Sequence, residues 1–499
     1  MSMLAHNQRT PGVYISEVAT HQIVIPVPTS IPIFIGYTEQ AMLKDRSLIK
    51  VPTSISSLSE FEQMFGKDYH PTFELAEVPK DFIGETIMVT EGVMVVKITD
   101  KHRCFFYSSI QLFFQNGGKE CFILSVGTYG DKGSDFQMDL KDYYGDENTS
   151  GIFQIMEQMN EPSLVVLPDI TSCGKDAYIL YQEILSHCQK MENRFAILDV
   201  LQEPFGTIDS DITNFRNAIG STCLNYGAAY YPWIDTDIIS KEQVDLRYLT
   251  NSIDLSKVLP EQEVQSILVE MKAMTDQQLI DSRSSIHAKL IASSETYYNI
   301  MEAIRKVLNL LPASSAMAGI YCAVDNTRGV WKAPCNLPLK GVEAPHIFIS
   351  DLQQLFMNID AAAGKSVNAI RAFPGLGTLA WGARTLDGNS GDWRYISVRR
   401  TLMMIEESVK VYMRTMIFEP NTSPTWNTIQ IMIDDFLINL WRLGALAGSK
   451  PQEAFNVQIG LGTTMTAQDI LNKTLKVQIG VAVVRPSEFI IVSISQAQA

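Results

Sequence analysis

The 499-residue sequence has little of what marks a disulfide-linked, zinc-binding or membrane-spanning protein. Its seven cysteines are an odd number with no CxxC pair, which argues against a disulfide framework and against a zinc site. No apolar run approaches the ~18 residues of a membrane span, and the N-terminal segment MSMLAHNQRT lacks the apolar core of a signal peptide. We therefore expect buried thiols in a reducing compartment, no metal site and no direct membrane insertion.

Catalytic and cofactor-binding motifs are also scarce. The histidines form no HExxH pair, and no GxSxG motif for a nucleophilic serine occurs. The run Gly375–Ala380 loosely fits a dinucleotide-binding loop, but Trp381 stands where a helix should open, so a tight connection between strands is the better interpretation. Asp169 and Asp199 end apolar strands, where α/β enzymes often place ligand-binding groups, although capping of the next segment is the favoured alternative. We expect no enzyme and no cofactor.

Charge is unevenly distributed along the chain. The 55 acidic and 40 basic residues give a net charge of −15, which argues against a nucleic-acid partner. From Ser366 onward there are 10 acidic and 12 basic residues, a net of +2, so the first 365 residues carry −17. The arginines of this last quarter could line a surface that faces an acidic partner. The alternative, left open by the sequence, is that several are buried beside Asp387, Asp392 or Glu406.

Both ends of the chain are typical of extended arms. Residues 1–28 alternate short apolar runs with prolines, which restrict helix formation, and residues 487–499 form an apolar strand that needs a partner sheet. The strand-forming residues of the two arms are Val13, Tyr14, Ile15 and Val18, and Phe489, Ile490, Ile491, Val492 and Ile494. The linkers that join the arms to the body are expected to include Pro26, Pro28, Arg485 and Pro486.

Residues 29–350 favour an α/β domain. The apolar run Ile31–Tyr37 predicts a buried strand that opens the domain. Between Gln111 and Ile234, apolar strands alternate with helical segments, which indicates a largely parallel sheet covered on both faces. Residues 237–311 change to polar helices of mixed charge and are interpreted as a solvated outer insertion.

Residues 351–486 favour a separate α+β domain. Apolar residues at steps of three and four predict two amphipathic helices, one through Leu402–Met416 and one through Ile429–Leu443. Ser423 before Pro424 is expected to cap the second helix. Alternating apolar residues from Leu475 to Val483 then predict a half-buried strand.

Motifs along most of the chain resemble the sheath proteins of contractile phage tails and phage-tail-like injection systems. The stretches that carry the resemblance include TPGVYISEV, IPIFIGYTE, FFQNGGKECFILSVGTYG, RFAILDV, GAAYYPWI, SSAMAGIYCAVDNTRGVWKAPCN, NAIRAFPGLGTLAWGARTLDGNSGDWRYISVRR, FEPNTSPTW, LWRLGALAG, TTMTAQDI and VVRPSEFIIVSI. As a set these stretches are highly specific. Residues 237–311 are the main part that the resemblance does not place, and many sheath proteins are shorter.

The resemblance implies a structural subunit that polymerises into stacked six-fold rings around an inner tube and contracts to drive that tube through a target envelope. It implies an outer mixed α/β domain, an inner C-terminal sheath domain, and arms that add strands to the sheets of neighbouring subunits. The implied partners are other copies of the chain, the inner tube, and baseplate and tail-terminator proteins. Assembly is expected in the bacterial cytoplasm, as part of a phage tail or phage-tail-like particle that can be released from the cell.

Contraction is expected as rigid-body movement of subunits while the arms stay joined and their linkers absorb the change. Arg399, Arg400 and Arg414 are the candidate tube-facing residues, because the last quarter carries the excess of basic charge. A static self-assembling filament or shell protein is the alternative function, and an enzyme on an α/β sheet is a more distant one. Neither the kind of particle nor the state of the sheath follows from the sequence.

Overall fold

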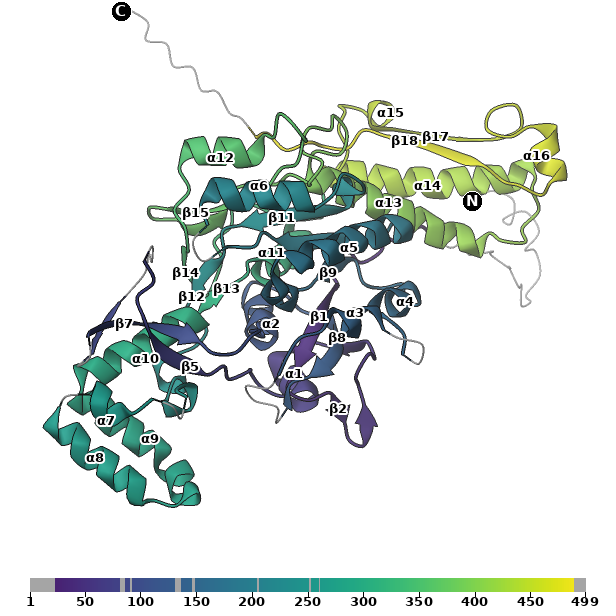
Figure 1. Ribbon diagram of the computed structural model, residues 1–499. Helices are drawn as coiled ribbons and strands as arrows, with labels where there is room; N and C mark the ends of the chain where they lie inside the picture. The colour runs from purple at the N-terminus through teal and green to yellow at the C-terminus, as the bar shows by residue number, and fades with distance from the viewer. Residues whose placement is uncertain are drawn as a thin grey trace, which may run out of the picture. The chain divides into compact units, whose positions relative to one another are not determined.

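The computed structural model describes residues 23–488, apart from 81–85, 90–91, 131–135, 146–148, 204–205, 251–252 and 260 (Figure 1). The predicted arm strands, with Val13, Tyr14, Ile15 and Val18 at one end and Phe489, Ile490, Ile491, Val492 and Ile494 at the other, lie outside these residues. The chain forms two compact units, one of residues 28–405 and 483–499 and a smaller one of residues 1–27 and 406–482.

The larger unit is built on an eight-stranded sheet in the order β16-β15-β11-β10-β9-β1-β8-β4. The strands from β8 to β15 are parallel, and the edge strands β4 and β16 are antiparallel. Their bounds are β1 Pro32–Thr38, β4 Thr53–Ile55, β8 Cys121–Thr128, β9 Leu164–Val166, β10 Phe195–Asp199, β11 Gly227–Tyr231, β15 Asn368–Phe373 and β16 Gly377–Ala380. The parallel sheet and its opening strand are confirmed.

Every residue of β1, β9, β10 and β11 is buried. Since successive side chains of a strand point to opposite faces of the sheet, both faces must be covered, and helices cover them. Helix α2 (Phe106–Gln115) packs against α11 (Ser314–Arg328), and α5 (Ala177–Met191) packs against α6 (Ile208–Ala218). Further elements before residue 160 include β2 Met42–Leu43, β3 Arg46–Ser47, α1 Leu58–Phe65, α3 Leu140–Tyr144 and α4 Ile152–Glu157. The fold places one large apolar core around the sheet.

Besides the β2–β3 pair, the described part of the larger unit contains two three-stranded antiparallel sheets. Strands β13 (Leu310–Leu311), β12 (Ile234–Thr236) and β14 (Val342–Pro345) form one, and β5 (Phe73–Glu77), β7 (Gly92–Ile98) and β6 (Ile87–Val89) form the other. Short 3-10 helices lie at Asp169–Asp176, Leu224–Tyr226, Lys241–Gln243 and Leu246–Tyr248. These elements extend the α/β body beyond the sheet that the sequence predicted.

The helices predicted for residues 237–311 are confirmed as α7 (Leu255–Val258), α8 (Gln262–Ala273), α9 (Asp276–Ser293) and α10 (Glu295–Leu308). The region is not solvated throughout, because α10 buries an apolar face with Tyr297, Ile300, Ile304 and Leu308 and contacts β6 and β7. Of these four helices, only α8 and α9 match the predicted solvated insertion of polar helices.

The β15–β16 hairpin joins the main sheet because β15 pairs in parallel with β11, with Tyr230 opposite Asn368. Gly375 and Gly377 adopt positive φ angles of 76° and 81° in its tight connection, as the strand interpretation of this run requires. The division between the units therefore falls inside α13 (Ile396–Thr415), between residues 405 and 406, and not near 351.

The smaller unit packs helices against a two-stranded sheet. Its elements are the second part of α13, α14 (Ser423–Arg442), α15 (Pro451–Ala454), β17 (Phe455–Ile459), α16 (Ala467–Leu471) and β18 (Val477–Val481). Both predicted amphipathic helices and the alternating strand are confirmed. The N-cap prediction was off by one residue: Thr422 occupies that position, and Ser423 and Pro424 lie in the first turn.

Candidate assembly interface

The described chain ends at an ion pair between Glu488 and Arg384, at the start of the predicted C-terminal arm. Glu488 is the last residue that the structure describes. The Arg384 guanidinium lies 2.6 Å and 2.8 Å from its two carboxylate oxygens, in a bidentate arrangement. Asn358 and Tyr395 donate further hydrogen bonds to the same carboxylate, at 3.1 Å and 3.2 Å. Glu488 is therefore held by four hydrogen bonds from three side chains, which lie in three separate segments of the chain.

The protonation of Glu488 follows from these contacts. Burial would raise its pKa, but the hydrogen bonds from Arg384 and Asn358 and the charge of Arg384 outweigh this effect, so the pKa is lowered. A carboxyl whose pKa is lowered by folding stabilises the folded state above its unfolded pKa, and this stabilisation is lost as pH falls through the folded value. The anchor is accordingly ionised at neutral pH.

The N-terminal arm joins the larger unit at a second buried ion pair, between Arg400 on α13 and Asp325 on α11. Their side chains are only 4% and 3% exposed, and the two shortest contacts are 2.6 Å and 3.0 Å. Thr29 donates its hydroxyl to Asp325 at 2.7 Å, and its carbonyl accepts from Arg400 at 2.8 Å. The guanidinium also lies 4.8 Å from the centre of the Tyr321 ring. The arm root is thus tied to the pair.

Arg399 and Arg400 are interior residues of the subunit rather than the surface residues that the charge count indicated. Each is 4% exposed. Arg399 donates to the Tyr226 hydroxyl at 2.6 Å and stacks on the rings of Tyr226 and Trp393. This finding corrects the expectation for these two arginines, because a buried guanidinium presents no surface to a partner. Of the three candidates, only Arg414 is exposed.

The predicted linkers coincide with the places where the chain passes between its units. The division falls between residues 27 and 28 at one end and between 482 and 483 at the other. Pro26 and Pro28 lie in a segment without helix or strand, in which the Val27 amide donates to Ser408 at 3.0 Å. Arg485 lies 3.7 Å from Asp392 in an exposed pair, and Pro486 follows it. Their role as hinges stays a prediction.

The smaller unit contains a sheet with open edges. Within the described ranges, β17 and β18 pair only with each other, with Val457 opposite Ile479. The sheet packs on α14 through β17, and Figure 1 shows the strand pair running alongside that helix. A two-stranded sheet is marginally stable by itself, and unpaired strand edges are templates for another strand. The described edges of β17 and β18 could therefore accept a further strand.

The enzyme candidates have structural contacts instead. Asp169 accepts hydrogen bonds from the backbone amides of Tyr37 at 2.8 Å and Phe105 at 2.6 Å, so it ties β1 to the start of α2. Asp199 accepts from the amide of Ser314 at 2.8 Å and so binds the first residue of α11. Burial raises the pKa of Asp169 to about 7 and that of Asp199 to about 6. Capping of a following element was the favoured alternative for both.

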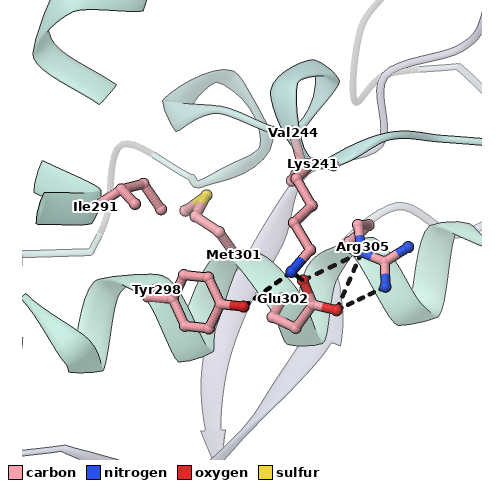
Figure 2. Close-up of a pocket in the computed structure, with 7 residues that line it drawn as sticks. All are labelled: Lys241, Val244, Ile291, Tyr298, Met301, Glu302 and Arg305. Atoms are coloured by element: carbon pink, nitrogen blue, oxygen red, sulfur yellow. Dashed lines mark hydrogen bonds and ion pairs between the residues drawn. The ribbon is translucent and has the colours of Figure 1, made fainter. Parts of the chain in front are cut away.

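A pocket beside α10 has polar groups that satisfy one another. Figure 2 shows Lys241 reaching toward Tyr298 and Glu302, with Arg305 on the other side of Glu302. Lys241 donates to the Tyr298 hydroxyl at 2.9 Å, and Arg305 lies 2.6 Å from Glu302. Among the described residues, no group of three or more His, Cys, Asp or Glu side chains could hold a metal ion. Every helix in the same ranges is too short or too polar to span a bilayer.

Sequence reasoning missed both arm anchors. Asp325 and Arg400 are far apart in the chain, as are Arg384 and Glu488, and no local spacing connects them. The sequence signal that could have pointed to the anchors was the set of arginines in the last quarter, for which burial inside the subunit was one of the two alternatives considered. Arg400 pairs with Asp325, which was not among the partners that the sequence suggested.

Comparisons with known proteins agree with this architecture. Residues 389–497 match the family described as "Phage tail sheath C-terminal domain". The PVC sheath complex of an extracellular contractile injection system, in its contracted state, shares 26% identity with a TM-score of 0.61 over 98% of both chains. The helical sheath of the anti-feeding prophage, also contracted, shares 25% identity with a TM-score of 0.60 over 98% of this chain and 99% of that one. A search of curated protein sequences finds no match.

A chain from the contracted anti-feeding prophage baseplate has the same fold, with a TM-score of 0.65 and 24% identity over 97% of this chain and 98% of that one. The likeness to these structures extends over almost the whole sequence, so it includes both units and not only the matched C-terminal domain. Residues 389–497 match the C-terminal domain of phage tail sheath proteins, and the likeness of almost the whole chain to contracted sheath structures supports a subunit of a contractile sheath.

Proposed function

We propose that this sheath subunit polymerises by strand exchange, in which the arms of one copy pair with the open edges of β17 and β18 in neighbouring copies. The observation that carries the proposal is the two-stranded sheet, whose strands pair only with each other in the described part of the chain. Each added backbone hydrogen bond contributes about 0.5–1.5 kcal/mol net, so one arm binds modestly and a helical array of arms binds strongly.

The two ion pairs at the arm roots also support this proposal. An arm transmits force to the body only if its root is fixed, and the Arg384–Glu488 and Arg400–Asp325 pairs fix the two roots. Both roots contact the start of the same helix, α13. Tyr395, directly before this helix, bonds to Glu488, and Arg400, in its second turn, bonds to Thr29. Movement of the body would therefore reach both arms through one rigid element. The chain's role is mechanical, and no step of it requires catalysis.

Truncation tests strand exchange. Removing residues 1–18, or residues 489–499 beyond the Glu488 anchor, should give a folded subunit with an unchanged melting temperature and no high-mass peak in size-exclusion chromatography. The full-length chain should polymerise under the same conditions. Polymers from both truncated chains would refute the proposal, and hollow tubes of fixed length would favour the static filament over a contractile sheath.

The inner tube is proposed as the partner that the sheath surrounds, with Arg414 as a contact to it. Arg414 lies on the exposed side of α13 in the smaller unit. An Arg414→Glu variant should assemble normally but capture less tube protein in a pull-down, whereas Lys289→Glu on α9 makes the same charge change without affecting capture. Equal capture by both variants would remove Arg414 from the interface.

Baseplate and tail-terminator proteins are the proposed partners at the two ends of the sheath. Assembly is proposed to take place in the bacterial cytoplasm, with later release of the particle. Neighbouring structures of similar fold come from an extracellular injection system and from prophage-derived particles, which supports this setting. Fractionation of producing cells before and after lysis would test it, since sheath polymers found only outside cells would contradict cytoplasmic assembly.

A further inference from the structure

Helix α12 (Asp351–Asn358) turns its apolar side toward solvent. Leu352, Leu355, Phe356 and Ile359, at steps of three and four, are between 38% and 77% exposed, and Phe348 just before the helix is 74% exposed. A helix on the surface of a domain normally buries this stripe and exposes the polar one. We call these five residues the α12 face. Clustered apolar side chains of this kind mark a surface that another segment covers.

The orientation of the helix is fixed by specific contacts. Ser350 and Gln353 form a capping box at its start. Gln354 donates to the Trp381 carbonyl at 2.7 Å and accepts from Arg371 at 2.5 Å, so its polar side is tied to the β15–β16 hairpin. Met357 is fully buried. Since these contacts hold the helix against β15, the α12 face cannot turn inward without breaking them (Figure 1).

The C-terminal segment of the same chain begins beside this face. Glu488, where the described chain ends, accepts a hydrogen bond from Asn358 at the last turn of α12. The sequence beyond it, FIIVSISQAQA, contains no charged side chain. An eight-residue helix is ~12 Å long, and six extended residues reach ~20 Å, so residues 489–494 can run the length of α12.

The spacing of the side chains also matches. In an extended segment Ile490, Val492 and Ile494 lie on one side, at ~6.6 Å intervals. Along α12, the exposed apolar residues recur once per turn, at ~5.4 Å. Because the segment is covalently attached next to the helix, its effective concentration there is on the order of millimolar, far above that of an arm from another subunit in dilute solution.

We propose that in the unassembled subunit residues 489–494 cover the α12 face of their own chain, and that they leave it when the arm joins a neighbouring sheet. The second half rests on the strand exchange proposed above. The contact hides an apolar arm and an apolar helix face from water at the same time. It also makes release of the arm a step that precedes polymerisation, so that free subunits do not associate at every encounter.

Photo-cross-linking of the full-length, unpolymerised subunit tests the contact. With p-benzoyl-phenylalanine in place of Leu352, irradiation should join α12 to residues 489–499, which cleavage after Glu488 releases as one peptide. The same probe in place of Met88, which is also 77% exposed but lies on β6, should not capture that peptide. In a mixture of ¹⁵N-labelled and unlabelled protein, the linked peptides should come from one chain. Absence of the tail peptide, or mixed isotope pairs, would overturn the proposal.

Assembly kinetics give a second, independent readout. Leu352→Ser combined with Leu355→Ser weakens the contact without touching either arm anchor, so the lag before polymerisation should shorten several-fold, whereas Met88→Ser should leave it unchanged. A longer lag would show that the α12 face is an interface of the polymer and would overturn the proposal. Strand exchange is tested separately, because the cross-link is measured in monomers. It fails if the chains without residues 1–18 and without residues 489–499 both still polymerise.

Discussion

Arg400 carries a buried charge whose guanidinium has partners inside the subunit. It neutralises Asp325, donates a hydrogen bond to the Thr29 carbonyl and stacks on the Tyr321 ring. A buried ion pair adds little compared with apolar residues of the same shape, but removal of one member leaves the other charge without compensation. The energetic importance of Arg400 therefore lies in what its loss would leave behind.

Replacement of Arg400 by alanine should lower the free energy of unfolding by about 3–5 kcal/mol, because Asp325 would keep an unpaired charge in the interior. Arg414→Ala, at an exposed position, should change it by less than about 0.5 kcal/mol. Urea unfolding of both variants, at a concentration where the subunit is monomeric, measures the difference. Equal effects would contradict the interior role of Arg400.

Asp169 gives the subunit a pH dependence of definite sign. Burial raises its pKa to about 7 in the folded state, against about 3.9 for an exposed aspartate. Between these values the folded state binds more protons than the unfolded state, so this group's contribution to stability falls as pH rises from about 4 to about 7. Asp68 and Asp199, whose pKa values burial raises to about 6, act in the same direction.

The variant Asp169→Asn should flatten the decline of the unfolding free energy between pH 4 and pH 7, because asparagine does not titrate. Asp209→Asn, which removes an exposed carboxylate from α6, should leave the slope unchanged. The measurement is chemical unfolding of the monomer at several pH values. An unchanged slope in Asp169→Asn would show that another group carries the dependence.

At the scale of elements, the strands of the two units differ in how completely they are paired. Strands β9 and β10 have a neighbour on each side in the main sheet, so their amides are protected within the subunit. Strands β17 and β18 have one described neighbour each. Hydrogen exchange of an unpaired edge amide requires no opening of the fold, whereas exchange from the centre of a sheet does.

We predict that amides in β17 and β18 exchange quickly in the monomer and become protected in the assembled sheath. Amides in β9 and β10 should be protected in both states and serve as the internal control. Hydrogen–deuterium exchange followed by mass spectrometry makes the comparison. Edge amides that remain equally exposed after assembly would place the arms somewhere other than on this sheet.

At the scale of the whole molecule, helices α8 and α9 contact chiefly each other and the neighbouring helices α7 and α10. They pack on each other, and their two ends meet where Ser294 donates to Glu261 at 2.7 Å. The main sheet, both arm anchors and the smaller unit are built from other residues. These helices are therefore expected to decorate the sheath without holding it together.

Deletion of residues 262–293, with Glu261 joined to Ser294 by two glycines, should leave polymerisation intact and reduce the outer diameter of the sheath. Negative-stain electron microscopy of the deleted and full-length proteins gives both readouts, and circular dichroism confirms that the shortened chain folds. A folded subunit that no longer polymerises would show that α8 and α9 contact neighbouring copies.

Local periodicity made several elements predictable. The apolar run at Ile31–Tyr37, the stripes along α13 and α14 and the alternation along β18 each follow from the sequence, because side chains repeat every 3.6 residues in a helix and every two in a strand. The hairpin at Gly375 was predictable because its turn needs residues that tolerate positive φ.

The sequence by itself determined the parallel sheet, the sheath family resemblance and the expectation of extended ends. Only the tertiary structure decided that Arg399 and Arg400 are buried, that Asp325 and Arg384 anchor the arm roots, and that α12 exposes its apolar side. The physical reason is the distance along the chain between the residues that interact. Periodicity reflects how each residue relates to its near neighbours, whereas the partner of a buried charge is set by packing between segments 75 to 104 residues apart in these two pairs.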